Sequence, residues 1–303
     1  MCIKGDGAVK QEKLKKNKNC LTKNIGQHKP DKLFFEQVHR IYLFMYNPVM
    51  GKCYTFVNQK GGVGKTTSAI NIGAYLTEAG KSVLLVDFDS QANLSSGVGI
   101  EEKDAKPGVY ELICGLAPLE AVIRPTQVKG LSVIPAEYNL SGAAVELIEQ
   151  EERDFFLEKA LEPARKNYDY ILIDCPPSLG VLTLNGITAA DEVLIPMQCE
   201  YFAMEGLTHL LQNVKRIQKT LNPSLDIGGI FFTMYDPRTR LAQQVVKEIS
   251  SYFKNKVFST IIPRNVRLSE APSHGLPISK YDPSCSGAKA YKSLAQEVLS
   301  RGD

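Results

Sequence analysis

Short apolar runs alternate with segments of helical periodicity from residue 51 onward. The apolar runs predict strands at 53–57, 83–86, 131–134, 170–174, 193–197 and 227–233. Apolar residues at helical spacing predict helices at 66–79, 142–150, 154–166, 182–189, 201–220, 238–253 and 287–300. Continuous apolar strands between amphipathic helices are typical of parallel sheets covered on both faces. The pattern therefore predicts a single α/β domain, residues 50–303, with a mostly parallel, twisted sheet and helices on both faces.

The first 49 residues differ from this pattern. Residues 10–18 are rich in lysine and asparagine and have few apolar side chains, which is typical of a solvated, disordered arm. Residues 1–50 carry ten Lys/Arg and four Asp/Glu, a net charge of +6, whereas the rest of the chain has a net charge of −3. We expect residues 1–49 to be a basic, disordered extension, or the product of a start site assigned upstream of Met50. A basic arm that contacts nucleic acid is the alternative.

Composition narrows the cellular setting. With 44% hydrophobic and 23% charged residues, the chain resembles ordinary globular proteins. No apolar run approaches the roughly 20 residues that span a bilayer. Seven cysteines, an odd number without paired spacing, fit a reducing compartment better than a disulfide framework. We therefore expect a cytoplasmic protein.

Residues 58–67, NQKGGVGKTT, join the first predicted strand to the first predicted helix. The ordinary phosphate-binding loop requires a glycine where this chain has Gln59, so the match is to the deviant form K-G-G-x-G-K-T. Glycines let backbone N–H groups approach a phosphate, and the following helix N-terminus adds a favourable partial charge. The loop predicts a P-loop NTPase domain in which Lys65 serves the bound phosphates. Lys60 is either a bystander or a charge for another phosphate.

Acidic residues lie at the ends of two predicted strands. Asp87 and Asp89 follow the strand predicted at 83–86, and Asp174 ends the strand predicted at 170–174. In an open α/β sheet the ligand site lies at the carboxyl ends of the strands. Asp174 is placed like the Walker-B aspartate that holds Mg²⁺ in P-loop NTPases, and Thr66 is expected to offer its hydroxyl to the same ion. Asp89 begins a polar loop and is better placed than Asp87 to orient an attacking water. Asp87 can equally cap the next helix, and both interpretations stay open.

Five segments resemble the ParA/Soj family of chromosome- and plasmid-partitioning ATPases, within the deviant-Walker group that includes MinD. They are NQKGGVGKTT (58–67), VLLVDFDSQANLSSGVGI (83–100), YDYILIDCPPSLG (168–180), IPMQCEYFAMEGL (195–207) and IIPRNVRLSEAPSHG (261–275). The last two are specific to the ParA/Soj branch. Ser90 stands where the family usually has proline, which we expect to change the stiffness of the loop and not its chemistry.

The resemblance implies an ATPase that uses ATP and Mg²⁺ and works as a homodimer. ATP would drive two subunits face to face, so that Lys60 of one subunit reaches the phosphates bound by the other. Lys65 would serve the phosphates in its own subunit, Asp89 would be the hydrolysis residue, and Pro263 and Asn265 would lie near the adenine. The implied nucleotide contacts are Lys60, Gly61, Gly62, Val63, Gly64, Lys65, Thr66, Thr67, Pro263 and Asn265, with Thr66 and Asp174 at the metal ion.

The resemblance also implies DNA binding without sequence preference by the ATP-bound dimer, location on the nucleoid, and hydrolysis stimulated by a ParB-like, centromere-binding partner. Basic side chains are the candidates for contacts with DNA phosphates. Segment 254–280 carries five basic residues against Glu270. The expected DNA contacts are Arg238, Arg240, Arg264 and Arg267. A solvated basic face that binds nothing is the alternative.

Other members of the group suggest competing functions. A MinD-like division-site ATPase needs a membrane-binding amphipathic helix beyond the fold. The last predicted helix has one apolar stripe and the sequence stops at Asp303, so we expect no membrane contact. A metabolic or regulatory ATPase with the same switch stays open. A redox relative would hold an iron–sulfur cluster, but Cys175 and Cys199 have no C-x-x-C neighbour, and we expect structural thiols. A tyrosine kinase of the group would have a C-terminal tyrosine cluster, which this sequence lacks.

Overall fold

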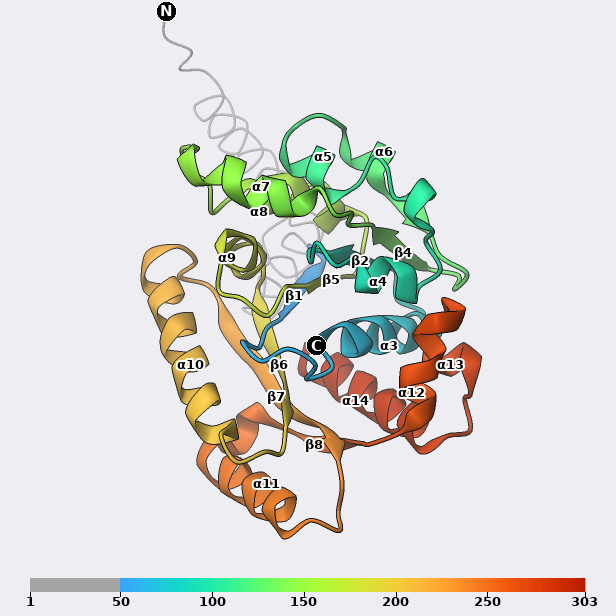
Figure 1. The fold of residues 1–303 in the computed structure, drawn as a ribbon, viewed down its shortest axis with the longest axis vertical. Helices are drawn as coiled ribbons and strands as arrows, with labels where there is room; N and C mark the ends of the chain where they lie inside the picture. Colours follow the sequence, from blue (N-terminus) through green and yellow to red (C-terminus); the bar gives the residue numbers. More distant parts are fainter. Residues whose placement is uncertain (1–49, 303) are drawn as a thin grey trace, which may run out of the picture. The chain divides into compact units, whose positions relative to one another are not determined.

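Figure 1 shows a computed structural model of the chain, which describes residues 50–302. The predicted extension, residues 1–49, lies outside the described residues, so its character stays a prediction. Within the described residues, eight strands form one sheet in the order β3-β4-β2-β5-β1-β6-β7-β8. In chain order they are β1 (Lys52–Phe56), β2 (Val83–Asp87), β3 (Arg124–Pro125), β4 (Leu131–Ile134), β5 (Tyr170–Asp174), β6 (Glu192–Gln198), β7 (Asp226–Tyr235) and β8 (Val257–Pro263).

Parallel pairing joins all described strands except β3, which runs antiparallel to β4. β1 lies inside the sheet, with β5 on one side and β6 on the other. The chain builds one half of the sheet through β2, β4 and β5, and then the other half from β6 onward. Such a reversal marks the place where α/β sheets bind ligands, at the carboxyl ends of the strands. The predicted fold class is confirmed.

Helices cover both faces of the sheet (Figure 1). One face carries α3 (Lys65–Glu78), α4 (Asn93–Gly97), α12 (Val266–Glu270), α13 (Ile278–Tyr281) and α14 (Ser286–Gly302). The other face carries α5 (Val109–Ile113), α6 (Leu119–Val122), α7 (Leu140–Glu146), α8 (Phe156–Leu161), α9 (Val181–Thr188), α10 (Ala203–Thr220) and α11 (Arg240–Phe253). Short 3₁₀ helices occupy Glu102–Asp104, Leu147–Glu149, Ala164–Lys166, Lys254–Lys256 and Ala271–His274.

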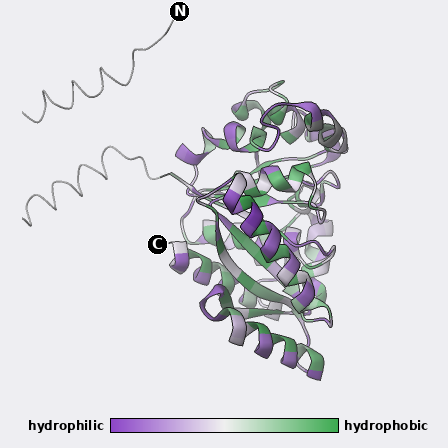
Figure 2. Ribbon diagram, turned by 90° about the vertical axis from the view of Figure 1, so that its left-hand side faces the viewer, coloured by the Kyte–Doolittle hydropathy of each residue, from purple (hydrophilic) through white to green (hydrophobic). Residues whose placement is uncertain are grey.

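Two hydrophobic cores lie on opposite sides of the sheet, because alternate residues of a strand point to opposite faces. In β2, Leu84 and Val86 belong to the core under α9 and α10, whereas Val83 and Leu85 belong to the core under α3 and α14. Figure 2 shows hydrophobic strands inside the domain and hydrophilic positions on the outer sides of the helices. Burial on both faces fixes the strands, and therefore the loops that follow them.

The sequence pattern predicts the central elements well and the edges less well. The strands at 131–134 and 170–174 are confirmed at those bounds. The helix predicted at 154–166 is instead α8 and a 3₁₀ turn, separated at Pro163, since proline cannot donate a backbone hydrogen bond. The pattern does not predict β8, an edge strand whose residues are mostly exposed or half-buried and whose pairing with β7 is irregular.

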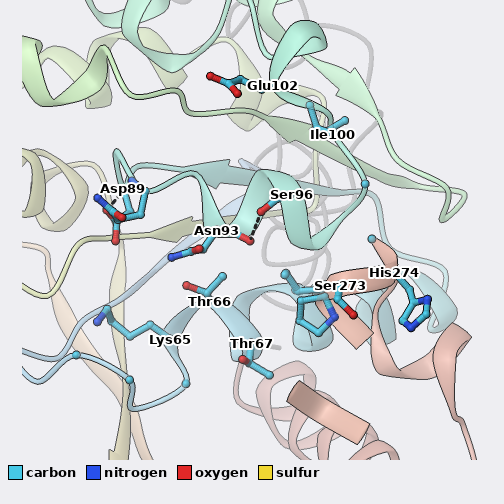
Figure 3. Close-up of a pocket in the computed structure, with 18 of the residues that line it drawn as sticks. Lys65, Thr66, Thr67, Asp89, Asn93, Ser96, Ile100, Glu102, Ser273 and His274 are labelled. Atoms are coloured by element: carbon cyan, nitrogen blue, oxygen red, sulfur yellow. Dashed lines mark hydrogen bonds between the residues drawn. The ribbon is translucent and has the colours of Figure 1, made fainter. Parts of the chain in front are cut away.

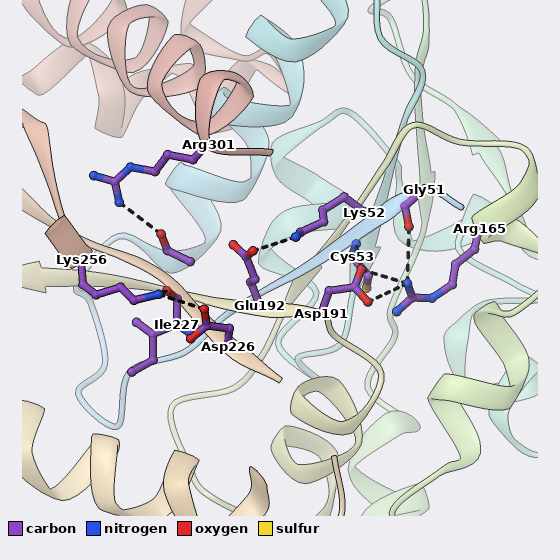
Figure 4. Close-up of polar contacts among 11 residues, drawn as sticks. Gly51, Lys52, Cys53, Arg165, Asp191, Glu192, Asp226, Ile227, Lys256 and Arg301 are labelled. Atoms are coloured by element: carbon purple, nitrogen blue, oxygen red, sulfur yellow. Dashed lines mark hydrogen bonds and ion pairs between the residues drawn. The ribbon is translucent and has the colours of Figure 1, made fainter. Parts of the chain in front are cut away.

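Ion pairs and hydrogen bonds join neighbouring strands at their amino-terminal ends, which lie opposite the carboxyl ends that form the site (Figure 4). Asp191 accepts from the backbone N–H of Cys53 at 2.7 Å and from the guanidinium of Arg165 at 2.9 and 3.0 Å. Arg301, near the end of α14, donates to the carbonyls of Gly228 and Val257 at 3.2 and 2.8 Å. These contacts hold the strands in register, and so position the loops at their other ends.

Candidate nucleotide site

The phosphate loop, residues 58–67, joins β1 to α3 as predicted. Gly62 and Gly64 have φ angles of 72° and 89°, a conformation that residues with a Cβ rarely adopt. A Cβ added at Gly61 or Gly62 would meet nothing within 4 Å, so this backbone faces open space. The free N–H groups at the start of α3 add positive partial charge. Together they form a cradle for an anion.

Two side chains from neighbouring strands hold the loop in place. Thr233 of β7 donates to the carbonyl of Val63 at 2.8 Å. Gln198, the last residue of β6, donates to the carbonyl of Gly62 at 3.0 Å. Neither contact is among the sequence-based predictions. The sequence does contain a signal for Gln198, because it directly follows the strand predicted at 193–197, and strand ends form the site.

Thr66 and Asp174 meet, as a shared metal ion requires. Oγ1 of Thr66 donates to Oδ2 of Asp174 at 2.5 Å. Oδ1 of Asp174 is buried and has no hydrogen-bond partner among the described residues. A buried polar atom without a partner is unfavourable until a ligand satisfies it. Mg²⁺ prefers oxygen ligands and keeps several waters, so this pair of side chains fits Mg²⁺ held together with nucleotide phosphates.

Burial shifts the proton affinities of the two charged groups at the cradle. Burial is the main cause that raises the pKa of Asp174, and the neighbouring carboxyl of Asp87 raises it further. Burial likewise lowers the pKa of Lys65, against the opposing effect of Asp174. Lys65 is only 7% exposed, and its Nζ donates to the carbonyl of Asn58 at 3.4 Å. Phosphates and Mg²⁺ would supply the opposite charges that these buried groups need.

Asp87 and Asp89 have different surroundings although they follow the same strand. Asp87 is fully buried and accepts from the N–H and the hydroxyl of Ser95 at 2.8 and 2.6 Å. It therefore satisfies a free N–H in the first turn of α4, which is the capping interpretation of this residue. Burial raises the pKa of Asp87 to about 6. Asp89 is half-buried and accepts from the N–H of Gln91 at 3.1 Å.

A cavity of about 1190 Å³ opens in front of the loop (Figure 3). Ligand pockets are typically about 300–1,000 Å³, so the cavity is large enough for a nucleotide. In Figure 3, Lys65 and Thr66 lie on one side of the cavity, and Asp89 and Asn93 face them from the other. The residues that line the cavity near the loop are Gly61, Gly62, Gly64, Lys65, Thr66 and Thr67. The wall from Pro272 to Gly275 is not among the predictions.

Lys60 lies at the entrance of the loop and is not among the residues that line this cavity. Its ammonium group forms an ion pair with Glu200 and donates to the side-chain carbonyl of Gln198 at 3.3 Å. The side chain of Lys60 is 52% exposed. Val63 is also absent from the lining because it is buried, so only its backbone can contribute to the cradle.

Pro263 and Asn265, the predicted adenine contacts, do not line the large cavity. Pro263 ends β8, and Asn265 caps α12 by accepting from the N–H of Arg267 at 2.8 Å. A second cavity of about 560 Å³ is lined by Met234 of β7 and by Arg264, which lies between the two predicted residues in the sequence. Contact of Pro263 and Asn265 with adenine stays a prediction.

The predicted DNA contacts lie at the edge of the sheet that carries the phosphate loop: Arg238 and Arg240 after β7, Arg264 and Arg267 after β8. All four are exposed. Arg238 pairs with Asp236 at 2.6 Å, and Arg267 pairs with Glu270 at 2.8 Å. Arg240 and Arg264 form no ion pair with any residue from 50 to 302.

The basic segment at 254–280 does not form one patch, contrary to what its sequence suggests. Lys254 and Lys256 precede β8, whereas Arg264 and Arg267 follow it. The seven residues of this strand separate the two groups by roughly 20 Å. Lys256 is also paired with Asp226 at 2.9 Å. The charge summed along the sequence therefore overstates the charge at either edge of the sheet.

The two cysteines weighed as cluster ligands are not among the residues that line the large cavity. Cys175 is fully buried and shares a hydrogen bond with Thr55 at 3.3 Å, in keeping with a structural thiol. Cys199 is half-buried beside the second cavity. In the part of the chain that the structure describes, no group of three or more His, Cys, Asp or Glu side chains could hold a metal ion. None of the helices described between residues 50 and 302 is long and apolar enough to cross a membrane.

These features define a P-loop ATPase, and the chain is similar in sequence and in fold to known ATPases. A family model described as an AAA domain matches residues 51–227. Cobyrinic acid a,c-diamide synthase from Mycobacterium smegmatis, solved with ADP and magnesium, is 36% identical with a TM-score of 0.72, covering 82% of this chain and 94% of that one. The septum site-determining protein MinD from Pyrococcus horikoshii, complexed with Mg-ADP, is 27% identical with a TM-score of 0.67, covering 82% and 96%.

Curated relatives are more similar still. The chromosome-partitioning ATPase Soj of Treponema pallidum is 62% identical over 252 residues, 83% of this chain and 98% of that protein. The sporulation initiation inhibitor protein Soj of Bacillus subtilis is 53% identical over 253 residues, 84% and 100% of the two chains. The chain belongs to the ParA/Soj family of chromosome-partitioning ATPases. It is an ATPase, and its cofactors are ATP and Mg²⁺, as predicted.

Proposed function

We propose that the chain is a DNA-segregation ATPase in which ATP causes two subunits to form a dimer that binds DNA. The observation that carries the proposal is the position of Lys60, a second loop lysine that lies outside the cavity formed by its own loop. In the proposed dimer two subunits meet face to face, and each Lys60 reaches the phosphates held by the other subunit. There it acts as an arginine finger does, by stabilising charge that develops on the phosphates during hydrolysis.

Within each subunit, Lys65 binds the phosphates, while Thr66 and Asp174 hold Mg²⁺, which neutralises phosphate charge. Asp89 orients the attacking water. Its place in the lining of the same cavity as Lys65 and Thr66 supports this role. A second support is the anchoring of its backbone, because the N–H of Asp89 donates to Oδ1 of the buried Asp87 at 3.3 Å.

The dimer binds DNA without sequence preference through basic side chains at the carboxyl edge of the sheet. Arg240 and Arg264 are the favoured contacts, because they are exposed and have no acidic partner among the described residues. Arg238 and Arg267 would first have to leave Asp236 and Glu270. Dimerisation doubles the number of DNA phosphates that can be neutralised, so affinity rises with ATP and falls with added salt.

Hydrolysis is stimulated by a ParB-like partner that binds a centromere, and it releases the subunits from DNA and from the nucleoid. Support comes from relatives named for chromosome partitioning, which this chain matches over nearly their whole length. The MinD-like alternative has weaker support, because the MinD structure is 27% identical whereas the Soj protein of T. pallidum is 62% identical.

Binding of a labelled, non-specific DNA duplex tests this proposal. Anisotropy is measured with ATP, with ADP and without nucleotide, all with Mg²⁺ and at several salt concentrations. We expect tight DNA binding with ATP but not with ADP or without nucleotide. Lys60→Ala should lose this ATP-dependent binding. Lys129→Ala, which removes an exposed lysine before β4, is the matched control and should bind like the unmodified protein. Equal binding in all three nucleotide states would overturn the proposed switch.

A further inference from the structure

We infer that Glu200 and Gln198 hold Lys60 in a resting position within its own subunit, and that the phosphates of a second subunit must displace Glu200 before Lys60 can act. The inference rests on the proposed action of Lys60 between subunits. It concerns the monomer before the dimer forms. The proposed function does not require any restraint on Lys60 at that stage.

One restraining contact comes from the last residue of β6, and the other from the segment that joins β6 to α10. The ammonium group of Lys60 forms an ion pair with the carboxylate of Glu200 and donates to Oε1 of Gln198 at 3.3 Å. The amide nitrogen of Gln198 donates in turn to the carbonyl of Gly62 at 3.0 Å. A single side chain of β6 therefore contacts both the loop backbone and the loop lysine.

The backbone of the loop entrance is fixed separately from the lysine side chain. The N–H of Lys60 donates to Oδ1 of Asn58 at 2.9 Å, and Nδ2 of Asn58 donates to the carbonyl of Pro196 in β6 at 2.8 Å. Lys60 can therefore leave Glu200 by rotating its flexible four-carbon stem, without disturbing the cradle. The restraint acts on the charge and leaves the loop in place.

The exposure of the pair sets the size of the effect. The side chains of Lys60 and Glu200 are 52% and 57% exposed, and ion pairs so exposed change an equilibrium constant by roughly twofold to fivefold. Each dimer releases two such pairs, so the combined effect on dimerisation is roughly fourfold to twenty-five-fold. Nucleotide phosphates carry more negative charge than one carboxylate, and so can displace it.

Charge removal at Glu200 tests the restraint. Dimer dissociation constants are measured by sedimentation with ATP and Mg²⁺, with Asp89→Ala in every protein to limit hydrolysis. Glu200→Gln should tighten the dimer by roughly fourfold to twenty-five-fold, because the amide no longer competes for Lys60. Glu205→Gln is the matched control: its carboxylate is 67% exposed on α10 and belongs to no ion pair with Lys60. An unchanged or weaker dimer in Glu200→Gln, or equal tightening by both substitutions, would overturn the restraint.

Carbodiimide cross-linking reports the contact itself. The reagent joins the amine of Lys60 to the carboxylate of Glu200 as an amide, and takes up the departing carboxylate oxygen as a urea. We expect the link in the nucleotide-free chain and a fall in its yield in the ATP dimer, both read by mass spectrometry. A yield that does not change when the dimer forms refutes the restraint. If no ATP dimer forms at all, the proposed function fails, and the link in the nucleotide-free chain still shows whether Glu200 holds Lys60.

Discussion

Replacing Asp174 with asparagine should separate stability from metal binding. The amide has nearly the same shape as the carboxyl, and its oxygen can still accept from the hydroxyl of Thr66, which now donates at 2.5 Å. It has no charge to offer Mg²⁺. We therefore expect Asp174→Asn to fold, and to lose ATP binding that depends on Mg²⁺.

The buried carboxyl sets the size of the stability change. Because burial raises the folded-state pKa of Asp174 above its unfolded-state value of about 4, the folded chain binds this proton more tightly. Its contribution to stability is complete below pH 4 and is lost as the pH rises toward the folded-state pKa, by up to about 1.4 kcal/mol per pH unit. Between about pH 5 and pH 7 the unmodified chain should therefore lose stability relative to Asp174→Asn, by up to roughly 3 kcal/mol.

Urea unfolding of both proteins at several pH values, without nucleotide, measures this difference. Titration with ATP in the presence and absence of Mg²⁺ measures the loss of metal-dependent binding. Parallel pH profiles for the two proteins would refute the raised pKa. Undiminished Mg²⁺-dependent binding by Asp174→Asn would refute the metal role, whatever the unfolding data show.

Three further substitutions test other parts of the molecule. Asp89→Ala should bind ATP and dimerise but release phosphate roughly a hundredfold more slowly, and normal turnover would assign the water to another residue. Gly186→Ala places a Cβ 2.3 Å from Sγ of Cys175, so urea unfolding should show a loss of about 1–3 kcal/mol that Cys175→Ala partly relieves; no relief would contradict the predicted clash. Arg301→Ala removes the hydrogen bonds to two strand carbonyls and the contact of the guanidinium with Phe258, whose ring centroid lies 3.9 Å away. The free energy of unfolding should fall by about 1 kcal/mol, which is detectable as a lower Tm. An unchanged Tm would show that these contacts do not stabilise the sheet edge.

The elements that are predictable from the sequence have signals contained within a few residues. Four of the five residues of β5 are apolar, and all five are buried. This apolar run can be recognised from the strand's own residues, without knowledge of its neighbours in the fold. The phosphate loop requires glycine at fixed positions because of its backbone angles. The meeting of Thr66 and Asp174 follows from the rule that strand ends form the site.

The remaining features depend on partners that are distant in the sequence. β8 is half-buried and acquires its pairing from β7, so its own residues show no clear period. α4 is five residues long, and Asp87 satisfies an N–H in its first turn. The contact between Lys60 and Glu200 joins residues 140 apart. No local pattern predicts such contacts, because burial and pairing are decided when the sheet assembles.

The action of Lys60 between subunits is tested most directly by mixing two inactive variants. Lys60→Ala keeps Lys65 and can hold ATP, whereas Lys65→Ala keeps Lys60 and lacks the lysine that serves its own phosphates. In a mixed dimer, Lys60 of one subunit meets the ATP held by the other, so one site is complete. We predict that each variant alone hydrolyses little ATP in the presence of DNA, and that the mixture recovers activity. If the two folded variants form a mixed dimer and the mixture is as inactive as its components, action between subunits is contradicted.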